Sequence, residues 1–420
     1  MRPFFAALAA TFCLSAAPAA AQADEADSRG YEIGFVAIGD MGYIPAYDTP
    51  DEDDERFRTL GAYLGNEAEE WLEHYRDLSE FRATPWQFES AIGGFVPASG
   101  MYPVAKAAAE VCERRGCDFG AILGDNIYPD GATLGADGIS DERRFREMLD
   151  QPYGRFGAGT PGFTLYAMMG NHDWRISREA TEAQLAYLQA HPNFTMPDLF
   201  YSAVPAGMEG QLEIFVIDTE MLLAGTQVRE DALDADGKPL PDTELEEWPD
   251  FVRPSNEREA NMVGWLTDAL ARSQAKWKIV MGHHALWSSG GSKYEKARSL
   301  RRLLLDPICR YADAYIAGDD HLIEAYTDDC STVAGAPDAP VPMMVSGAGS
   351  KYRQQHVAFA EQQIAANPQM TNLFSRGSTW GFVYVGISGD ELTTTLFSTP
   401  ADQSGRPIEE ASFTFAHRSR

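Results

Sequence analysis

Five short polar blocks occur in order along the sequence, and each one follows an apolar run of strand-like length. Two of these runs, residues 33–38 before Asp40 and residues 120–123 before Asp125, have the uninterrupted apolar pattern of strands buried on both faces. The five blocks are residues 39–42, 124–128, 170–173, 280–284 and 318–321. In α/β proteins, polar residues that follow buried strands meet at one sheet edge, where ligands bind. The sequence therefore predicts an α/β fold with a polar site at its strand ends.

The chain has 420 residues, a length that permits one large α/β domain or two smaller ones. No repeat or low-complexity linker divides it, so we expect a single domain over residues 24–420. Polar segments at about 44–101 and 222–255 interrupt the strand pattern and are interpreted as insertions. The first carries four aromatic residues that we expect on its surface, Trp71, Tyr75, Trp86 and Phe88. Strand-like runs beyond Pro342 predict a largely antiparallel C-terminal sheet.

Residues 1–23 have the composition of a cleaved signal peptide. Arg2 precedes an apolar stretch, and the small-residue ending Ala-Gln-Ala comes just before Asp24. A membrane anchor is the alternative, but the apolar stretch is short, and no later segment approaches the roughly 20 apolar residues that a membrane span needs. We therefore expect an exported protein, periplasmic or secreted, without stable membrane association.

Removal of this segment would leave four cysteines, an even number for an oxidising compartment. They permit two disulfides in three connectivities, of which Cys112–Cys117 with Cys309–Cys330 is the simplest. The alternative is four buried thiols.

The charge balance is strongly acidic. The chain has 34 Lys and Arg against 63 Asp and Glu, which gives a formal net charge of −29. Nucleic acid is therefore not an expected partner. A phosphate ester would be weakly repelled at long range, so local cations must attract it.

The residue types in the blocks favour a catalytic metal site. Asp, Asn, His and Tyr offer oxygen and nitrogen ligands without the thiolates of a structural zinc site. Two metal ions about 3.5–4 Å apart can clamp a phosphoryl displacement, and they need a bridging carboxylate, for which Asp125 is the candidate. Tyr128 could bind a hard ion, and because a phenol has a pKa near 10, a phenolate ligand favours Fe(III). The alternative for Tyr128 is a packed loop aromatic.

The ordered blocks resemble those of the calcineurin-type metallophosphoesterases, and among these the small, tartrate-resistant purple acid phosphatases. The resemblance covers about residues 31–398, including residues 194–201 and 346–349. It implies a four-layer α/β/β/α sandwich of two mixed sheets faced by helices. It also implies an exported metal-dependent phosphatase that hydrolyses small phosphomonoesters with a metal-bridging hydroxide.

The resemblance further implies the roles of individual residues at the first metal position. Asp40, Tyr128 and His321 would bind a ferric ion, with Asp125 bridging to a second ion. His172 would lie beside the bound phosphate and stabilise the charge of the transition state.

At the second position the sequence departs from the family. Asn171 and His283 would bind a divalent ion, Fe, Mn or Zn, but the family motif Gly-His-x-His is replaced here, with Asp319 in place of its first histidine. A carboxylate can still ligate, and it would favour a harder ion over zinc and make metal-bound water less acidic. Alternatively, Asp319 turns away and the second metal is weak or lost.

A second departure concerns the leaving-group acid. The family places a histidine in the loop after His283, whereas residues 288–293 of this chain contain none. Lys293, His284 or His172 could replace it, although an activated leaving group would need no acid. The candidate catalytic residues are thus His172, His284 and Asp125, and for His284 the alternative is a packing role.

Two other functions stay open from the sequence. One is phosphodiester or nucleotide hydrolysis, with the insertion at 44–101 shaping a larger pocket. The other is a metal- or phosphate-binding protein that has lost turnover because of its two departures from the family.

Overall fold

The computed structural model describes residues 30–47, 55–74, 77–79, 81–90, 93–224, 226, 228–229, 245–246, 249–290 and 293–418. The predicted signal peptide, residues 1–23, lies outside the described residues, and so does much of the segment 222–255. Among the described helices, none is long and apolar enough to cross a membrane.

Two seven-stranded sheets form the centre of the molecule, and both contain parallel and antiparallel neighbours, which confirms the predicted pair of mixed sheets. In spatial order, the first sheet contains β18 (Ile408–Ala416), β17 (Glu391–Thr399), β16 (Trp380–Ser388), β1 (Ile33–Ile38), β4 (Phe119–Ile122), β5 (Leu165–Ala167) and β6 (Phe194–Thr195). The second contains β15 (Met370–Arg376), β13 (Ile323–Asp328), β14 (Val341–Ser346), β12 (Ala314–Ala317), β11 (Trp277–Met281), β8 (Leu212–Val216) and β7 (Tyr201–Ala203). Strands β16 to β18 are antiparallel, as predicted for the C-terminal part, whereas β14 runs parallel to β12.

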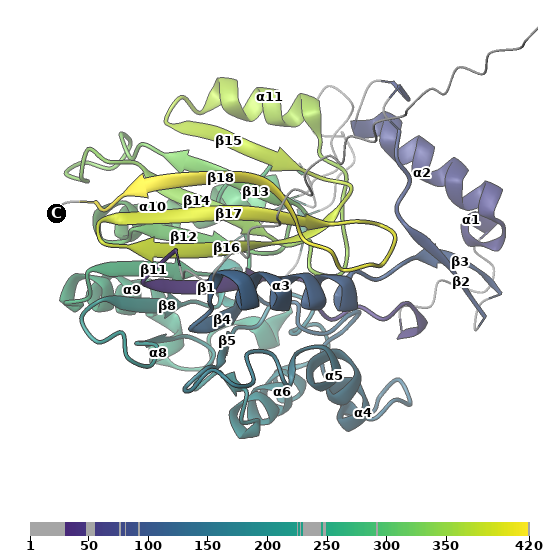
Figure 1. Cartoon of the computed structure of the whole chain (residues 1–420), viewed down its shortest axis with the longest axis horizontal. Coiled ribbons are helices and arrows are strands. Elements are labelled where there is room, and N and C mark those ends of the chain that lie inside the picture. Colours follow the sequence, from purple (N-terminus) through teal and green to yellow (C-terminus); the bar gives the residue numbers. More distant parts are fainter. Residues whose placement is uncertain are drawn as a thin grey trace, which may run out of the picture.

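Helices lie on the outer faces of the sheets. Helix α3 (Met101–Arg115) packs on β1, β16 and β17 and lies in front of that sheet in Figure 1. On the other sheet, Nζ of Lys278 in β11 donates to the carbonyl oxygen of Leu270 in α9 (Met262–Arg272) at 3.0 Å. The remaining helices are α1 (Glu55–Arg58), α2 (Leu60–His74), α4 (Asp141–Phe145), α5 (Gln151–Tyr153), α6 (Arg178–Ala190), α7 (Thr219–Leu223), α8 (Glu257–Ala260), α10 (Tyr294–Tyr311) and α11 (Val357–Ala366), with short turns at Pro45–Tyr47, Arg146–Asp150 and Asp250–Val252. The layers therefore follow the predicted α/β/β/α order.

The inner faces of the two sheets pack against each other through β13, β14, β16 and β17. Ser346, the last residue of β14, bridges them, because its Oγ donates to the carbonyl oxygen of Ala37 at 2.7 Å and accepts from the backbone nitrogen of Val383 at 3.1 Å. Glycines let the ends of β1 and β12 approach closely, since a Cβ atom at Gly39 would lie only 2.9 Å from the Cα atom of Gly318. The strand ends of both sheets thus meet in one place.

The segment 44–101 contributes α1, α2 and the β2 (Trp86–Glu89) and β3 (Gly94–Pro97) hairpin at the right of Figure 1. The prediction that Trp71 lies on its surface is wrong. Its side chain is buried because Nε1 donates to the carbonyl oxygen of Asp77 at 2.8 Å and the indole packs edge-on against Phe81. Trp86 and Phe88 are exposed, as expected, and Tyr75 lies outside the described residues. The division of the chain into one domain with two insertions stays a prediction.

The two disulfides have the predicted pairing, Cys112–Cys117 and Cys309–Cys330. The first closes the C-terminal end of α3 onto the start of β4. The second joins α10 to the loop after β13, across a sequence separation of 21 residues.

Removing the longer disulfide is expected to cost more stability than removing the shorter one. In the chain-entropy description, a loop of 21 residues contributes about 3 kcal/mol and a loop of 5 residues about 2 kcal/mol. Urea denaturation of the Cys309→Ala/Cys330→Ala variant should therefore show the larger fall in the free energy of unfolding. The Cys112→Ala/Cys117→Ala variant is the matched control, and an equal or larger loss there would contradict the expectation.

Candidate metal centre

Three aspartates stand just beyond strand ends of the two sheets. Asp40 follows β1, Asp125 follows β4 and Asp319 follows β12. Their φ angles are 58°, 48° and 67°, in the left-handed region, which costs a residue other than glycine roughly 1–2 kcal/mol. Such backbone conformations persist only where the surrounding structure holds them, and they cluster at functional sites. The three aspartates therefore mark the candidate site.

The first group of donor atoms surrounds the hydroxyl of Tyr128. This hydroxyl lies 2.7 Å from Oδ1 of Asp40 and 2.8 Å from Oδ2 of Asp125. Nε2 of His321 lies 3.1 Å from the same hydroxyl and 3.3 Å from Oδ1 of Asp40. The phenol and both carboxylates are buried. The structure thus brings together the four residues that the resemblance assigned to the first ion.

The second group surrounds Nε2 of His283. This nitrogen lies 3.2 Å from Oδ1 of Asn171, 3.3 Å from Oδ1 of Asp125 and 3.8 Å from Oδ1 of Asp319. The other ring nitrogen, Nδ1, is 2.7 Å from the carbonyl oxygen of Leu123, which can only accept a hydrogen bond. The proton therefore resides on Nδ1, and Nε2 is directed at the oxygens, the arrangement typical of a metal-binding histidine.

The pKa values of the clustered side chains are shifted by burial and by the neighbouring charged groups. Burial raises the pKa of Asp40 well above its usual value, although the charge of His283 opposes this. Burial also acts to raise the pKa of Asp125, but electrostatic interactions and hydrogen bonds with His283 and His172 outweigh it, so that pKa is lowered. Burial and the two neighbouring carboxylates raise the pKa of the Tyr128 phenol. Buried negative charge of this density calls for a cation.

The donor set fits metal ions. Asp40, Asp125 and His283 offer ligand atoms within 4.8 Å of one another, and so do His283, His284 and Asp319. Oδ2 of Asp319 is buried and makes no hydrogen bond with any described residue, which is costly for a carboxylate oxygen unless a cation contacts it. Oxygen and nitrogen donors without thiolates suit hard and borderline ions.

The side chain of Asp319 faces into the cluster, with Oδ1 at 3.8 Å from Nε2 of His283, and its role as a metal ligand stays a prediction. Its Oδ1 lies 3.2 Å from Nζ of Lys293, and its side chain is buried. Burial acts to raise the pKa of Asp319, but Lys293, together with His284, His283 and Lys296, outweighs this effect and the pKa is lowered. The negative charge that Asp319 adds where the family has a neutral histidine is therefore balanced by Lys293.

His284 is anchored in the interior. Its Nδ1 lies 2.8 Å from Oγ1 of Thr219, which also accepts from the backbone nitrogen of His284 at 3.0 Å. Its carbonyl oxygen accepts from the hydroxyl of Tyr315 at 2.7 Å. The side chain is fully buried, and burial lowers its pKa well below the usual value. His284 therefore presents no exposed edge to a substrate.

His172 lies at the partly exposed edge of the cluster. Its backbone nitrogen donates to Oδ1 of Asp125 at 2.8 Å, and its ring centroid lies 4.3 Å from that of Tyr128. Burial lowers the pKa of His172 to about 3, although the charge of Asp125 opposes this. The location of His172 beside a bound phosphate stays a prediction.

Asp173 is a site residue whose role was not predicted from the sequence. Its buried carboxylate accepts from the backbone nitrogen of Gly170 at 2.9 Å, from Nδ2 of Asn126 at 2.9 Å and from Nε2 of Gln184 at 2.8 Å. Burial, with the charge of Asp125, raises its pKa to about 7. Asp173 thus fixes the turn that carries Asn171 and His172. In the sequence, the one indication of this role was its place as the last residue of the third block.

Replacing Asp173 by alanine is expected to destabilise the protein by about 3–5 kcal/mol, because several buried donors lose their acceptor at once. The turn that carries Asn171 should loosen, so metal content should fall as well. Urea denaturation and metal analysis test this expectation, with Asp268→Ala on α9, an exposed position, as the control. A loss no greater than that of the control would contradict the role of Asp173.

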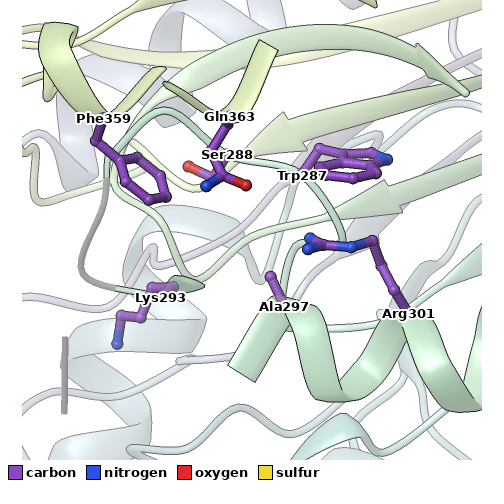
Figure 2. Close-up of a pocket in the computed structure, with 7 residues that line it drawn as sticks. All are labelled: Trp287, Ser288, Lys293, Ala297, Arg301, Phe359 and Gln363. Atoms are coloured by element: carbon purple, nitrogen blue, oxygen red, sulfur yellow. The ribbon is translucent and has the colours of Figure 1, made fainter. Parts of the chain in front are cut away.

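A small pocket of about 240 Å³ lies next to Lys293 (Figure 2). The guanidinium of Arg301 covers the ring of Trp287 at 3.7 Å from its centroid. Phe359 lines another side, and both aromatic residues are buried. We therefore interpret the pocket as the surroundings that hold Lys293 near Asp319.

Comparison with known proteins agrees with this geometry. Residues 35–322, more than half of the chain, match the family described as Calcineurin-like phosphoesterase. Purple acid phosphatase 17 of Arabidopsis thaliana is 27% identical over 279 residues, which cover 65% of this chain and 70% of that protein. Purple acid phosphatase 3 of the same plant is 25% identical over 297 residues, 70% of this chain and 69% of that protein.

Among solved structures, the fold is similar to that of a protein described as GAP50, the anchor in the inner membrane complex of Plasmodium. The TM-score is 0.54 at 17% identity, with 92% of this chain and 90% of that chain covered. This likeness concerns the fold alone.

Two sheets whose strand ends share a cluster of Asp, Asn, His and Tyr define a metal-dependent phosphoesterase. The chain belongs to the calcineurin-like phosphoesterase family, which acts on small phosphate esters and whose purple acid phosphatase members imply a dinuclear metal site.

Proposed function

We propose that the protein hydrolyses phosphomonoesters at a dinuclear metal centre bridged by Asp125. The position of Asp125 carries this proposal. Its Oδ2 faces the first donor group, 2.8 Å from the hydroxyl of Tyr128, whereas its Oδ1 faces the second, 3.3 Å from Nε2 of His283. One carboxylate with an oxygen toward each group is what a bridged pair of ions requires.

In this proposal the first group, Asp40, Tyr128 and His321 with Asp125, holds Fe(III). The pKa of the Tyr128 phenol is raised by burial and by the carboxylates of Asp125 and Asp40. Only a strongly charged ion would take such a phenol as phenolate, which supports iron at this position.

The second group, Asn171, His283 and Asp319 with Asp125, would hold divalent Fe, Mn or Zn. The ion pair between Asp319 and Lys293 supports a ligand role for the carboxylate, because it keeps the net charge close to that of a site with histidine there. A carboxylate oxygen in place of an imidazole nitrogen shifts the preference toward harder ions such as Mn.

When bound, the two ions supply an activated water and positive charge around the phosphoryl group. The residues of the chain position the ligand atoms and the proton donor. The carbonyl of Leu123 holds the proton on Nδ1 of His283 and so keeps Nε2 free to ligate. Nζ of Lys293, in the loop after His283 and 18% exposed as a side chain, is the proposed proton donor to the leaving group. His284 lacks that access because it is buried.

We also propose export to the periplasm or the cell exterior. The two disulfides support it, since such bonds persist mainly in oxidising compartments.

Steady-state hydrolysis of p-nitrophenyl phosphate and of its bis-ester tests the proposed function. The protein would be reconstituted with iron plus manganese or zinc and assayed from acidic to neutral pH. Faster turnover of the monoester is the expected result. Faster turnover of the diester would replace the proposal with a phosphodiesterase, and turnover of neither ester would favour a binding protein.

A further inference from the structure

The two ring nitrogens of His172 have different, fixed partners. Nδ1 lies 2.5 Å from the carbonyl oxygen of Pro129, which only accepts, so Nδ1 carries the proton. Nε2 lies 3.2 Å from a guanidinium nitrogen of Arg175, which only donates, so Nε2 is the acceptor. In this arrangement Nε2 has no proton to donate to a phosphate oxygen. The guanidinium of Arg175 does have protons to donate at this edge of the cluster.

The backbone that carries Arg175 is firmly held. The backbone nitrogen of Arg175 donates to the carbonyl oxygen of His172 at 3.3 Å. The preceding residue, Trp174, is buried, and its Nε1 donates to Oδ2 of Asp218 at 2.9 Å. The Arg175 side chain is 48% exposed, and its other terminal nitrogen lies 3.7 Å from the half-exposed carboxylate of Asp130. A guanidinium has five donors, so several remain for a ligand.

Arg175 is connected to the metal cluster through a single imidazole ring. Nε2 of His172, which receives the guanidinium, lies 3.8 Å from Oδ2 of Asp125. The guanidinium thus lies one imidazole nitrogen away from the proposed bridging carboxylate, on the partly exposed side of the cluster. At long range the net charge of −29 would repel an anion, so a local positive charge at the exposed edge of the cluster supplies attraction there.

We propose that Arg175 is a substrate-binding residue that contacts the phosphoryl group and selects dianionic phosphomonoesters over monoanionic diesters, with His172 as the residue that positions it. This inference rests on the proposed function and deepens it by assigning the substrate class to a residue. The guanidinium fork suits two phosphate oxygens at once.

The charge of the two ester classes explains the selectivity. A phosphomonoester has a second pKa near 6 and carries close to two negative charges at neutral pH. A diester carries one, and one of its phosphate oxygens is blocked by the second ester group. Loss of Arg175 should therefore weaken binding and turnover of the monoester more than those of the diester.

The test compares Arg175→Gln with Arg175→Lys in metal-loaded protein at neutral pH. For Arg175→Gln, kcat/KM for p-nitrophenyl phosphate should fall by about 10- to 100-fold, while that for the bis-ester should change by less than about 3-fold. The Kd for inorganic phosphate, measured by calorimetry, should rise by about the same factor by which kcat/KM for the monoester falls. Arg175→Lys should recover part of both effects, because it keeps the charge but not the fork.

Two further variants sharpen the test. Arg272→Gln, an exposed arginine on α9, is the matched control and should leave both esters and phosphate binding unchanged. His172→Ala should reproduce the altered ester preference of Arg175→Gln, and the double variant should show little additional loss, because one residue acts through the other.

Equal losses for both esters, or an unchanged Kd for phosphate in Arg175→Gln, would overturn the assignment. If the wild-type protein turned over neither ester, the proposed function would fail, but phosphate binding would still decide the role of Arg175. A weaker phosphate Kd in Arg175→Gln would then support the anion site by itself. A wild-type protein that bound no phosphate would overturn both.

Discussion

Changing Asp125 to asparagine is expected to lower kcat/KM for a phosphomonoester by at least about 10³-fold. The amide keeps the shape of the side chain but has one oxygen and no charge. The carboxylate of Asp125 lies 2.8 Å from the hydroxyl of Tyr128 and 3.3 Å from Nε2 of His283. The single amide oxygen could bind an ion at one of these two groups but not at both. Metal analysis after gel filtration should therefore show fewer bound ions than in the wild-type protein.

Asp118 provides a matched control for this variant. It flanks the opposite end of β4, where its Oδ2 accepts from the backbone nitrogen of Gly34 at 2.9 Å. Asp118→Asn should retain its metal ions and keep turnover within about 2-fold of wild type, since it lies away from the cluster. Normal turnover in Asp125→Asn would refute the bridging role, whereas equal losses in both variants would indicate damage to the strand.

A second large effect is expected at Asp319. Changing it to histidine restores the residue of the family but leaves the ammonium of Lys293 without the carboxylate that lies 3.2 Å away. An uncompensated cation beside the divalent ion should weaken metal binding, and turnover should fall by about 10- to 100-fold. Adding Lys293→Met to this variant removes the extra charge and should recover much of the metal affinity.

The measurement is a double-mutant cycle on the Kd for Mn²⁺, with turnover followed in parallel. Strong coupling between the two positions is expected because the residues are in contact. Turnover in Asp319→His above that of wild type would indicate instead that the carboxylate impairs the site. Unchanged metal content in Asp319→His, in Lys293→Met and in the double variant would place Asp319 outside the metal-binding set.

The parts of the fold and site that could be predicted depend on local pattern. Apolar runs identify β1, β4, β11 and β12, and the polar residue after each run identifies a donor. Parallel strands bring such residues to one edge irrespective of what lies between them in the chain. For this reason the convergence of Asp40, Asp125 and His283 was predictable, although it joins residues far apart in sequence.

Other features have no such signal. The burial of Trp71 depends on contacts between the end of α2 and the irregular segment that follows it, where Phe81 and the carbonyl of Asp77 lie. The contact of Arg175 with His172 arises from a turn, and three residues of spacing in a turn do not reveal which side chains meet. Likewise, the missing loop histidine pointed to Lys293 as a possible proton donor to the leaving group. The sequence did not reveal that Lys293 forms an ion pair with Asp319.

The meeting of strand ends from both sheets gives the cluster a mechanical role. Asp40 and Asp125 belong to one sheet, whereas His283, Asp319 and His321 follow strands of the other, and the backbone nitrogen of Asp319 donates to Oδ2 of Asp40 at 2.9 Å. Ions held there would act as a non-covalent cross-link between the two halves of the sandwich. Ligand at about 1,000 times its Kd stabilises a native state by about 4 kcal/mol. The concentration of available metal would then determine the free energy of unfolding as well as the rate of the reaction.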